Sequence, residues 1–299
     1  MRTSAPSDAV ITKRPLKDSA GRPTFGVEVG GIDLRDADDQ LLELLATTWS
    51  EHPLVLIRDQ LLDEPTLMRV SSAFGELEQV VRKDIHSRYH PQVALVTNLY
   101  LEDGTNLGGL GSYELRWHTD QSYRERPATG AAFYAMEVPP NGGDTHWINT
   151  VLAYEALDSE TRALIDARHG LFAYQMYDTD ITDAPAVRSI RDRTPDARHP
   201  TVLYHPVDGQ PNLYFDPTQT YAIDGHDEDT SEALVSKLSA HLMQPEFRHT
   251  HRWRLGDLML WDNARLLHSR EAFDPKLPRL AKRTTIFLRP DLFPVPALP

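Results

Sequence analysis

The sequence predicts a mainly β fold of the sandwich or barrel kind, flanked by α-helices. From residue 91 onward, short runs rich in β-branched and aromatic residues alternate with Gly, Pro and Asn. Many short strands separated by turns are typical of sandwiches and barrels, whereas a doubly wound sheet alternates each strand with a helix. Helical periodicity appears only near the N-terminus and in two later inserts.

The N-terminal part predicts two amphipathic helices with a buried strand between them. Residues 38–51 place four leucines and Trp49 at helical spacing, and "HPLVLIRDQ" then has the pattern of a short apolar strand. A second helix is predicted over residues 63–77, with Asp63 as its N-cap and Pro65 in its first turn. The chain therefore begins with an α/β arrangement before the β-rich part.

The β-rich part predicts many strands, two helices and one long loop. Residues 158–170 predict a helix that opens at Asp158 or Ser159 and closes at Gly170, and residues 228–243 predict another. Residues 101–114 are rich in glycine without the spacing of a phosphate-binding motif, which predicts a loop or lid. The predicted strands cover residues 92–100, 129–138, 144–150, 201–207, 211–215, 247–255, 257–263 and 283–290.

The composition narrows the chemistry that the chain can perform. The chain has 299 residues, of which 40% are hydrophobic, so it is long enough to bury a sizeable core. It contains no cysteine, which excludes disulfides, zinc–thiolate sites and a cysteine nucleophile. Any metal site must therefore be built from histidines and carboxylates.

Charge and hydropathy limit the partners and the location. The formal net charge of −13 would repel a phosphate backbone, so nucleic acid is not expected as a partner. No apolar run is long enough to cross a bilayer, and the N-terminus lacks the apolar core of a secretory signal. We therefore expect a cytoplasmic protein without a membrane partner. A homo-oligomer is compatible with the sequence, which shows no pattern that defines an oligomeric state.

One short motif, "WHTD", points to a metal ion. His118 and Asp120 are two residues apart, so on a strand their side chains face the same side of the sheet. Alone, the pair is equally compatible with one core histidine and one surface carboxylate. Two histidines and one carboxylate form the facial triad of non-haem Fe(II) oxygenases, which leaves three coordination positions free. His268 in "LLHSR" is a candidate for the third ligand, and Arg279 and Arg283 follow it.

The ordered set of motifs resembles the taurine/2-oxoglutarate dioxygenase family. The similarity extends from "HPLVLIRDQ" through "RWHTDQSY" and "GGDT" to "WDNARLLHSR" and "PRLAKRTTIFLRP", which is most of the chain. A His-x-Asp pair is common by chance, but the pair followed in order by these segments is specific. The resemblance implies a double-stranded β-helix, or jelly roll, in a single domain over residues 1–299, with the N-terminal helices packed outside it.

The resemblance also implies roles for individual residues. His118, Asp120 and His268 match the three ligands of Fe(II). Thr145 and Arg279 match the positions that hold the distal carboxylate of 2-oxoglutarate. A guanidinium suits this task because it pairs with both oxygens of a carboxylate, and a hydroxyl can complete the site.

The residues that would contact the primary substrate are less well defined. Arg283 matches a position that receives an anionic group of the substrate in some members of the family. Tyr113 and Phe215 are candidates for the pocket lining, although a core role is commoner for such aromatic residues. Residues 83–115 and 174–225 would shape the pocket and match the family least. The sequence therefore indicates a small-molecule substrate, amino-acid-derived or a secondary metabolite, without identifying it.

The implied reaction oxidises 2-oxoglutarate with O₂ to succinate and CO₂ and couples this to oxidation of an aliphatic C–H. Hydroxylation is the usual outcome, and desaturation, epoxidation or ring closure use the same ligands. Halogenation is disfavoured because Asp120 occupies the position that halogenating relatives leave to a small residue. The alternative is a jelly-roll metal-binding protein without redox catalysis. Such a protein has no need for Thr145 and Arg279, so their presence favours the enzyme.

Overall fold

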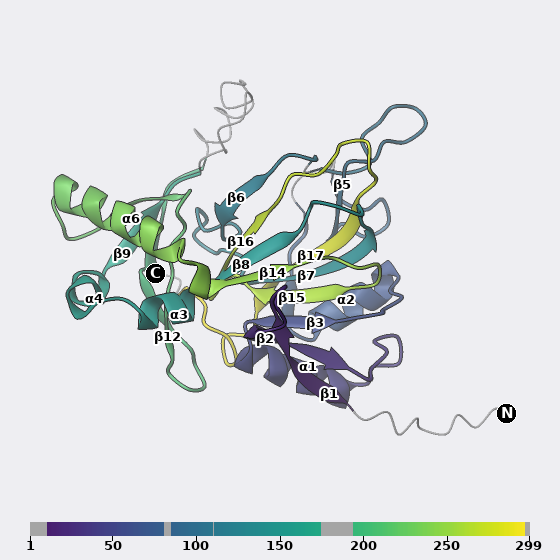
Figure 1. Ribbon diagram of the computed structural model, residues 1–299, viewed down its shortest axis with the longest axis horizontal. Coiled ribbons are helices and arrows are strands. Elements are labelled where there is room, and N and C mark those ends of the chain that lie inside the picture. Colours follow the sequence, from purple (N-terminus) through teal and green to yellow (C-terminus); the bar gives the residue numbers. More distant parts are fainter. Residues whose placement is uncertain (1–10, 81–84, 110, 175–193, 297–299) are drawn as a thin grey trace.

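Two β-sheets that pack face to face form the centre of the protein (Figure 1). The computed structural model describes residues 11–80, 85–109, 111–174 and 194–296. The larger sheet follows the order β1-β2-β3-β15-β7-β17-β4, and β5 pairs with β17 beside this path. Its strands are β1 (Thr12–Lys17), β2 (Pro23–Gly30), β3 (Leu54–Ile57), β4 (Gly75–Leu77), β5 (Val93–Thr97), β7 (Gly130–Glu137), β15 (Leu258–Asp262) and β17 (Leu280–Leu288).

The smaller sheet contains both segments of the predicted metal motif. Its strands follow the order β14-β8-β16-β6, and each neighbouring pair is antiparallel. They are β6 (Leu115–His118), β8 (Thr145–Asn149), β14 (Arg248–His251) and β16 (Leu266–Arg270). Two sheets around a common core, with helices outside, make up a jelly roll, so the predicted mainly β class is confirmed.

Alternating side chains along the strands separate an inner core from the outer ones. On β15, Met259 and Trp261 face the space between the sheets, whereas Leu258 and Leu260 face helices on the other side. This follows from the period of two along a strand. Trp147 of the smaller sheet packs against Trp261, with ring centres 5.9 Å apart. The inner core between the two sheets is thus partly aromatic.

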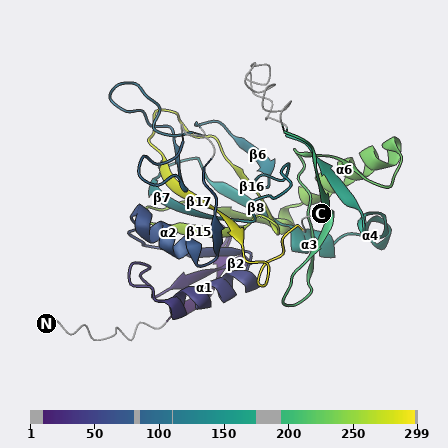
Figure 2. The ribbon, with the colours of Figure 1, turned by 180° about the vertical axis from the view of Figure 1, so that it is seen from behind.

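Two N-terminal helices cover the outer face of the larger sheet (Figure 2). They are α1 (Asp39–Glu51) and α2 (Glu64–Ser72). Their N-caps are Asp38 and Asp63, whose carboxylates accept hydrogen bonds from backbone N–H groups of the first turn. Trp49 is fully buried between the helices and the sheet. The helices predicted in this part of the chain are confirmed, including the cap at Asp63.

A lobe beside the smaller sheet is built from the residues between β8 and β14; we call the described residues 150–174 and 194–247 the lateral lobe (Figure 1). Its helices pack against Ile148 and Leu267 on the outer face of the smaller sheet. They are α3 (Thr150–Glu155), α4 (Ser159–Ile165), α6 (Glu228–Leu242) and the 3-10 helix η1 (Pro245–Phe247). Its strands are β9 (His169–Phe172), β10 (Ala197–Pro200), β11 (Val202–Tyr204), β12 (Pro211–Leu213) and β13 (Thr220–Ile223).

Two predicted helices are longer than the observed ones. The helix predicted over residues 63–77 ends at Ser72, and Gly75 starts β4 in close contact with β17. A β-carbon at Gly75 would lie 2.0 Å from the backbone oxygen of Phe287, so only glycine fits there. The helix predicted to close at Gly170 ends at Ile165. Ala167 then has a φ of 60°, and Gly170 lies in β9 instead.

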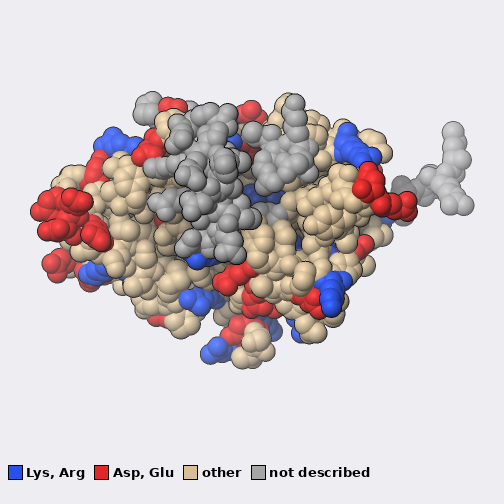
Figure 3. All heavy atoms as spheres, turned by 90° about the horizontal axis from the view of Figure 1, so that it is seen from above, with Lys and Arg blue, Asp and Glu red and all other residues tan. Residues whose placement is uncertain are grey.

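The negative charge of the chain is unevenly distributed over the surface. Seen from above, acidic side chains gather at the end of the molecule where α6 begins (Figure 3). Glu228 and Asp229 lie in the first turn of that helix, where a carboxylate stabilises the positive end of the helix dipole. Among the described residues, no helix is both long enough and apolar enough to span a membrane.

Candidate metal and co-substrate site

Three side chains from two neighbouring strands converge beside the inner core. His118 is the last residue of β6, and it pairs in register with His268 of β16. Asp120 follows two residues after His118. One possible ligand atom of each residue lies within 4.8 Å of the others. The structure therefore brings the three predicted ligands together, and in the described ranges no other group of three His or acidic residues does so.

Local geometry turns these three side chains toward one another. His118 Nδ1 lies 2.7 Å from the carbonyl oxygen of Arg116, which can only accept, so Nδ1 carries a proton and Nε2 is the atom suited to bind a metal. The Nε2 atoms of His118 and His268 are each 3.9 Å from an oxygen of Asp120. Gln121 then has a φ of 57°, a left-handed conformation that turns the chain away from the strand.

Burial and charge favour the protonation states that a metal requires. Burial alone would raise the pKa of Asp120, but Arg283, His268 and His118 together hold it below its usual range. Arg283 donates a hydrogen bond to Asp120 Oδ2. Burial, with a smaller effect of His118, lowers the pKa of His268 well below its usual value. A neutral imidazole and an ionised carboxylate are metal ligands, and two of the former with one of the latter suit non-haem Fe(II).

Thr145 lies on the inner face of the neighbouring strand. It begins β8, opposite Arg270 in register, and its side chain is buried. The indole nitrogen of Trp253 donates a hydrogen bond of 2.9 Å to Thr145 Oγ1. Because an indole N–H only donates, the hydroxyl of Thr145 accepts this bond and keeps its own hydrogen for another acceptor. A carboxylate oxygen is such an acceptor.

Arg279 is a buried cation without an anion in the described part of the chain. The residue is 4% exposed, and its guanidinium carbon lies 5.4 Å from the ring centre of Phe133 and 5.9 Å from that of Phe273. No carboxylate or carbonyl among the described residues accepts a hydrogen bond from its guanidinium. Burial, reinforced by the charge of Arg270, lowers the pKa of Arg279 to about 9, so it is charged at neutral pH. An unpaired buried cation calls for an anionic ligand.

The turn before Thr145 runs beside Arg279. A β-carbon placed on Gly143 would lie 3.6 Å from Arg279 Nε. Gly142 and Gly143 both have positive φ angles, of 73° and 72°, which other residues rarely adopt. The glycines of "GGDT" therefore allow the backbone to bring Thr145 and Arg279 to the same region.

Arg270 is a further buried cation of this region, and the sequence reasoning did not select it as a site residue. It donates hydrogen bonds to the carbonyl oxygens of Gly111 and Tyr113. The backbone N–H of Phe273 donates to the carbonyl oxygen of Ser112 over 3.0 Å. Three successive carbonyls ahead of β6 are thus bound by residues 270–273. The sequence feature that could have selected Arg270 is its spacing, because a residue two positions after His268 shares its strand face.

The residues predicted to contact the substrate have different environments. Arg283 lies next to the ligands, because it bonds to Asp120 and its guanidinium carbon is 5.6 Å from the ring centre of Trp261. Tyr113 is 45% exposed. Phe215 is 1% exposed and packs in the apolar core beneath α6. The pocket role predicted for Phe215 is therefore wrong, because an enclosed ring cannot line an open pocket.

Other aromatic residues of the smaller sheet have structural environments. Trp117 is partly buried against the outer core of the lateral lobe. This follows from strand alternation, since its neighbour His118 faces inward. His249 and His251 are buried in β14, as expected of a structural strand. Of the segments assigned to the substrate pocket, residues 83, 84, 110 and 175–193 lie outside the described residues.

Known proteins match the chain over most of its length. Residues 14–285 match the family described as taurine catabolism dioxygenase TauD, TfdA family. The chain belongs to this family. The (S)-phenoxypropionate/alpha-ketoglutarate-dioxygenase of Delftia acidovorans is 30% identical to it, over 90% of this chain and 94% of that protein. The pentalenolactone F synthase of Streptomyces avermitilis is 26% identical, over 88% of this chain and 91% of that protein.

One solved structure supports both the fold of this chain and its use of 2-oxoglutarate as co-substrate. The crystal structure of AAD-2 in complex with Mn(II) and N-oxalylglycine has a TM-score of 0.76 to this chain, with 26% identity over 93% of this chain and 96% of that one. As a member of the TauD, TfdA family, the present chain is an Fe(II)-dependent dioxygenase that uses 2-oxoglutarate, also called alpha-ketoglutarate, and O₂. That conclusion favours the enzyme over a jelly-roll metal-binding protein without redox catalysis.

Proposed function

We propose that His118, Asp120 and His268 bind the Fe(II) ion and that Thr145 and Arg279 bind the distal carboxylate of 2-oxoglutarate. The observation that carries this proposal is a converging His-Asp-His set together with a buried guanidinium that has no anionic partner among the described residues. The rings of Phe133 and Trp261 connect the two, because Phe133 packs against both Arg279 and Trp261, and Trp261 packs against His268. A metal and a dicarboxylate together would satisfy both groups. Neither an apolar ligand nor a metal alone would satisfy Arg279.

Within the metal site, the chain's residues fix the ligands in place. Bound Fe(II) supplies the one-electron chemistry that activates O₂. The carbonyl of Arg116 holds the ring of His118 in one tautomer, with Nε2 toward Asp120. Arg283 holds one oxygen of Asp120 through a hydrogen bond. The ligands are therefore oriented before metal binding, which reduces the entropy lost on coordination.

Within the co-substrate site, two donors are prepared for one carboxylate. Arg279 offers parallel N–H groups that match both oxygens of a carboxylate. The hydroxyl of Thr145 donates a third hydrogen bond, because Trp253 already occupies one of its lone pairs. The rings of Phe133 and Phe273 beside the guanidinium exclude water, which strengthens the ion pair.

For the reaction, we propose a small organic molecule that is oxidised at an aliphatic C–H. In hydroxylation, one oxygen atom of O₂ enters the product and the other enters succinate, while 2-oxoglutarate loses CO₂. Desaturation, epoxidation and ring closure remain alternatives for the outcome. Relatives named for phenoxypropionate and pentalenolactone F support a small, partly apolar substrate. We assign Arg283 to an anionic group of that substrate, with Tyr113 at the rim of the pocket.

An anaerobic titration with Fe(II) and 2-oxoglutarate tests the site assignment. The chelate of 2-oxoglutarate on Fe(II) produces a visible charge-transfer band, which we expect in the wild-type protein. His118→Ala should lose the band, and Arg279→Ala should require a much higher 2-oxoglutarate concentration to produce it. A full band in His118→Ala at wild-type concentrations would remove His118 from the ligand set.

The proposal also includes the predictions from the sequence about domain organisation, location and partners. They are a single domain over residues 1–299, a cytoplasmic location and no nucleic-acid or membrane partner. The formal net charge of −13 supports the absence of a nucleic-acid partner. A homo-oligomer is compatible with this reading, and the oligomeric state can be measured by size-exclusion chromatography with light scattering.

A further inference from the structure

The segment between the first two proposed ligands lies beyond the end of β6, so it needs support from outside the sheet. Its middle residue, Thr119, is 3% exposed. The backbone N–H of Thr119 donates a hydrogen bond of 3.1 Å to Asp216 Oδ2. Its hydroxyl donates to the carbonyl oxygen of Asn263. Thr119 is therefore held at two points, and one of them is a carboxylate of the lateral lobe.

Asp216 is fully buried, and its carboxylate accepts hydrogen bonds on both oxygens. On Oδ2, the hydroxyl of Ser122 donates over 2.9 Å, next to the N–H of Thr119. On Oδ1, the backbone N–H and the hydroxyl of Thr218 donate over 2.9 and 2.8 Å, and the N–H of Gln219 donates over 3.2 Å. Three of these groups are backbone N–H groups, which only donate, so both oxygens of Asp216 are acceptors. Burial raises the pKa of Asp216, and the hydrogen bonds from Thr218 and Ser122 oppose this rise.

A second buried residue of the lateral lobe holds the same segment a few residues later. His199 is 1% exposed, and its Nε2 lies 3.0 Å from the carbonyl oxygen of Ser122 and 2.8 Å from that of Arg124. Since carbonyl oxygens only accept, Nε2 carries the proton. Residues 119–124 are thus fastened to the lateral lobe through an acceptor, Asp216, and a donor, His199.

We propose that Asp216 is a positioning residue that fixes the His118–Asp120 segment in the geometry that binds the metal. The proposal rests on the assignment of His118 and Asp120 as ligands. Residues that orient metal ligands from outside the coordination sphere commonly control metal affinity. Asp216 acts on the backbone between the two ligands, so a shift of Thr119 displaces both side chains at once.

The chemistry of this position requires a carboxylate rather than an amide. An asparagine has one oxygen and one NH₂ group. If its oxygen faces Thr119 and Ser122, its NH₂ group faces the three donors of Thr218 and Gln219. In the opposite orientation, the NH₂ group faces the N–H of Thr119. Asp216→Asn therefore leaves buried donors without an acceptor while it preserves the size of the side chain.

Cobalt(II) binding to the full-length protein tests the proposal, because Co(II) has visible bands that report its coordination geometry. The variants are Asp216→Asn and, as a matched control, Thr218→Val, which removes a donor from the other side of the same carboxylate. We expect Asp216→Asn to weaken Co(II) binding by about tenfold to a hundredfold and to alter the bands. Thr218→Val should keep the wild-type affinity and spectrum even if its unfolding temperature falls.

The outcomes of these measurements distinguish failure of the proposal from failure of the ligand assignment. A folded Asp216→Asn variant with wild-type Co(II) affinity and spectrum would overturn the proposal, as would equal losses in Asp216→Asn and Thr218→Val. His118→Ala is measured in parallel, and wild-type Co(II) binding by this variant would overturn the ligand assignment itself. If Asp216→Asn does not fold, hydrogen exchange of the Thr119 amide in the metal-free wild-type protein decides. Strong protection supports the proposal, and exchange at the rate of an exposed loop contradicts it.

Discussion

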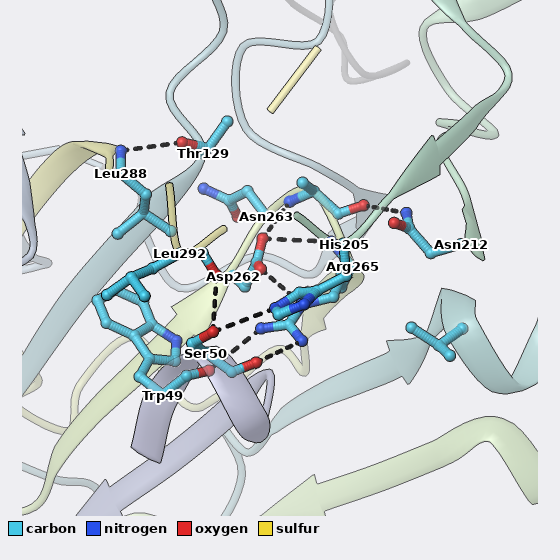
Figure 4. A network of polar contacts seen from close by, with 12 residues as sticks. Trp49, Ser50, Thr129, His205, Asn212, Asp262, Asn263, Arg265, Leu288 and Leu292 are labelled. Carbon is cyan, nitrogen blue, oxygen red and sulfur yellow. Dashed lines mark hydrogen bonds and ion pairs between the residues drawn. The ribbon is translucent and has the colours of Figure 1, made fainter. Parts of the chain in front are cut away.

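Arg265 and Arg279 are buried almost equally, at 3% and 4% exposure, but their guanidinium groups have opposite environments. Arg265 lies in the turn between β15 and β16, where its Nε donates over 2.7 Å to Asp262 (Figure 4). Its other nitrogens donate to the carbonyl oxygens of Ser50 and Trp49. The guanidinium of Arg279 donates to no carboxylate or carbonyl of the described residues, whereas its backbone N–H donates to Asn98 Oδ1.

The network around Arg265 connects the barrel to α1. The carbonyls of Trp49 and Ser50 belong to the last turn of that helix, where backbone oxygens lack partners within the helix. The last turn contains no basic residue of its own, so Arg265 supplies the positive charge from another element. The hydroxyl of Ser50 donates in turn to the carbonyl oxygen of Leu292, as Figure 4 shows.

The difference indicates which buried charges serve the architecture and which serve a ligand. A buried charge costs several kcal/mol unless it is paired, so each is expected to have a partner in the working protein. Arg265 has its partners within the chain. For Arg279, the partner we propose is the distal carboxylate of 2-oxoglutarate. The comparison therefore predicts that a substitution of Arg265 lowers the unfolding free energy, whereas the same substitution of Arg279 weakens 2-oxoglutarate binding.

The largest effect is expected at the proposed metal ligands, because the role proposed for Arg279 depends on a co-substrate bound to that metal. His118→Ala should abolish turnover, measured as succinate release, while the unfolding temperature changes little. His146→Ala is the matched control, since His146 lies on β8 of the same sheet, two strands from β6, and contacts Thr250 and Glu271 instead. Undiminished 2-oxoglutarate consumption by His118→Ala would show that oxidation of the co-substrate does not depend on His118.

At Arg265, we expect a large loss of stability. Arg265→Met removes one partner of a buried ion pair and takes away the donor that binds Asp262 Oδ2 and the donors that bind two helix carbonyls. Breaking such a pair costs about 3–5 kcal/mol of unfolding free energy. Urea unfolding followed by circular dichroism measures this loss. A decrease of less than about 1 kcal/mol would mean that the network in Figure 4 contributes little to stability.

At Arg279, the same substitution should affect binding rather than stability. Arg279→Met should weaken 2-oxoglutarate binding by about 2–5 kcal/mol, because a buried carboxylate loses its charged partner. Its unfolding free energy should not fall, since methionine fits the apolar surroundings of Phe133 and Phe273. Calorimetric titration with Mn(II) present measures the affinity. Arg254→Met, which removes an exposed positive charge, is the control and should bind 2-oxoglutarate normally.

The smallest effect is expected at the edge of the Arg265 network. Ser50→Ala removes the hydrogen bond to Leu292 and should lower the unfolding free energy by about 1 kcal/mol. Thr47→Ala removes an exposed hydroxyl from the same helix and should change it by less than about 0.5 kcal/mol. Chemical denaturation of both variants distinguishes them. Equal effects would show that the buried network adds nothing beyond helix propensity.

The proposed metal ligands were predictable from the sequence because their signal is local and ordered. His118 and Asp120 are two residues apart in one short motif, and His268 follows in a segment whose motif is specific. Arg279 and Thr145 were predicted as binding residues in the same way. The sequence could not show that Arg279 lacks an anionic partner among the residues that the structure describes, because this depends on which residues surround it in the fold.

Asp216 was not predictable, for a related reason. In the sequence it lies in "FDPTQT", which reads as an ordinary turn, and two of its donors, from Thr119 and Ser122, are more than ninety residues away. The closing point of the helix that begins at Ser159 was missed because Ala167 gives no signal for its left-handed conformation. The edge strand β1 was missed because Pro15 interrupts its pattern.

Thermal unfolding of the wild-type protein and Arg279→Met, with Mn(II) and with or without saturating 2-oxoglutarate, tests the central claim most directly. We predict that 2-oxoglutarate raises the wild-type midpoint by about 5 °C. Arg279→Met should start at or above the wild-type midpoint without 2-oxoglutarate and gain nothing from it. If Arg279→Met starts well below the wild type, or gains as much from 2-oxoglutarate as the wild type does, Arg279 is part of the architecture and not the partner of the co-substrate.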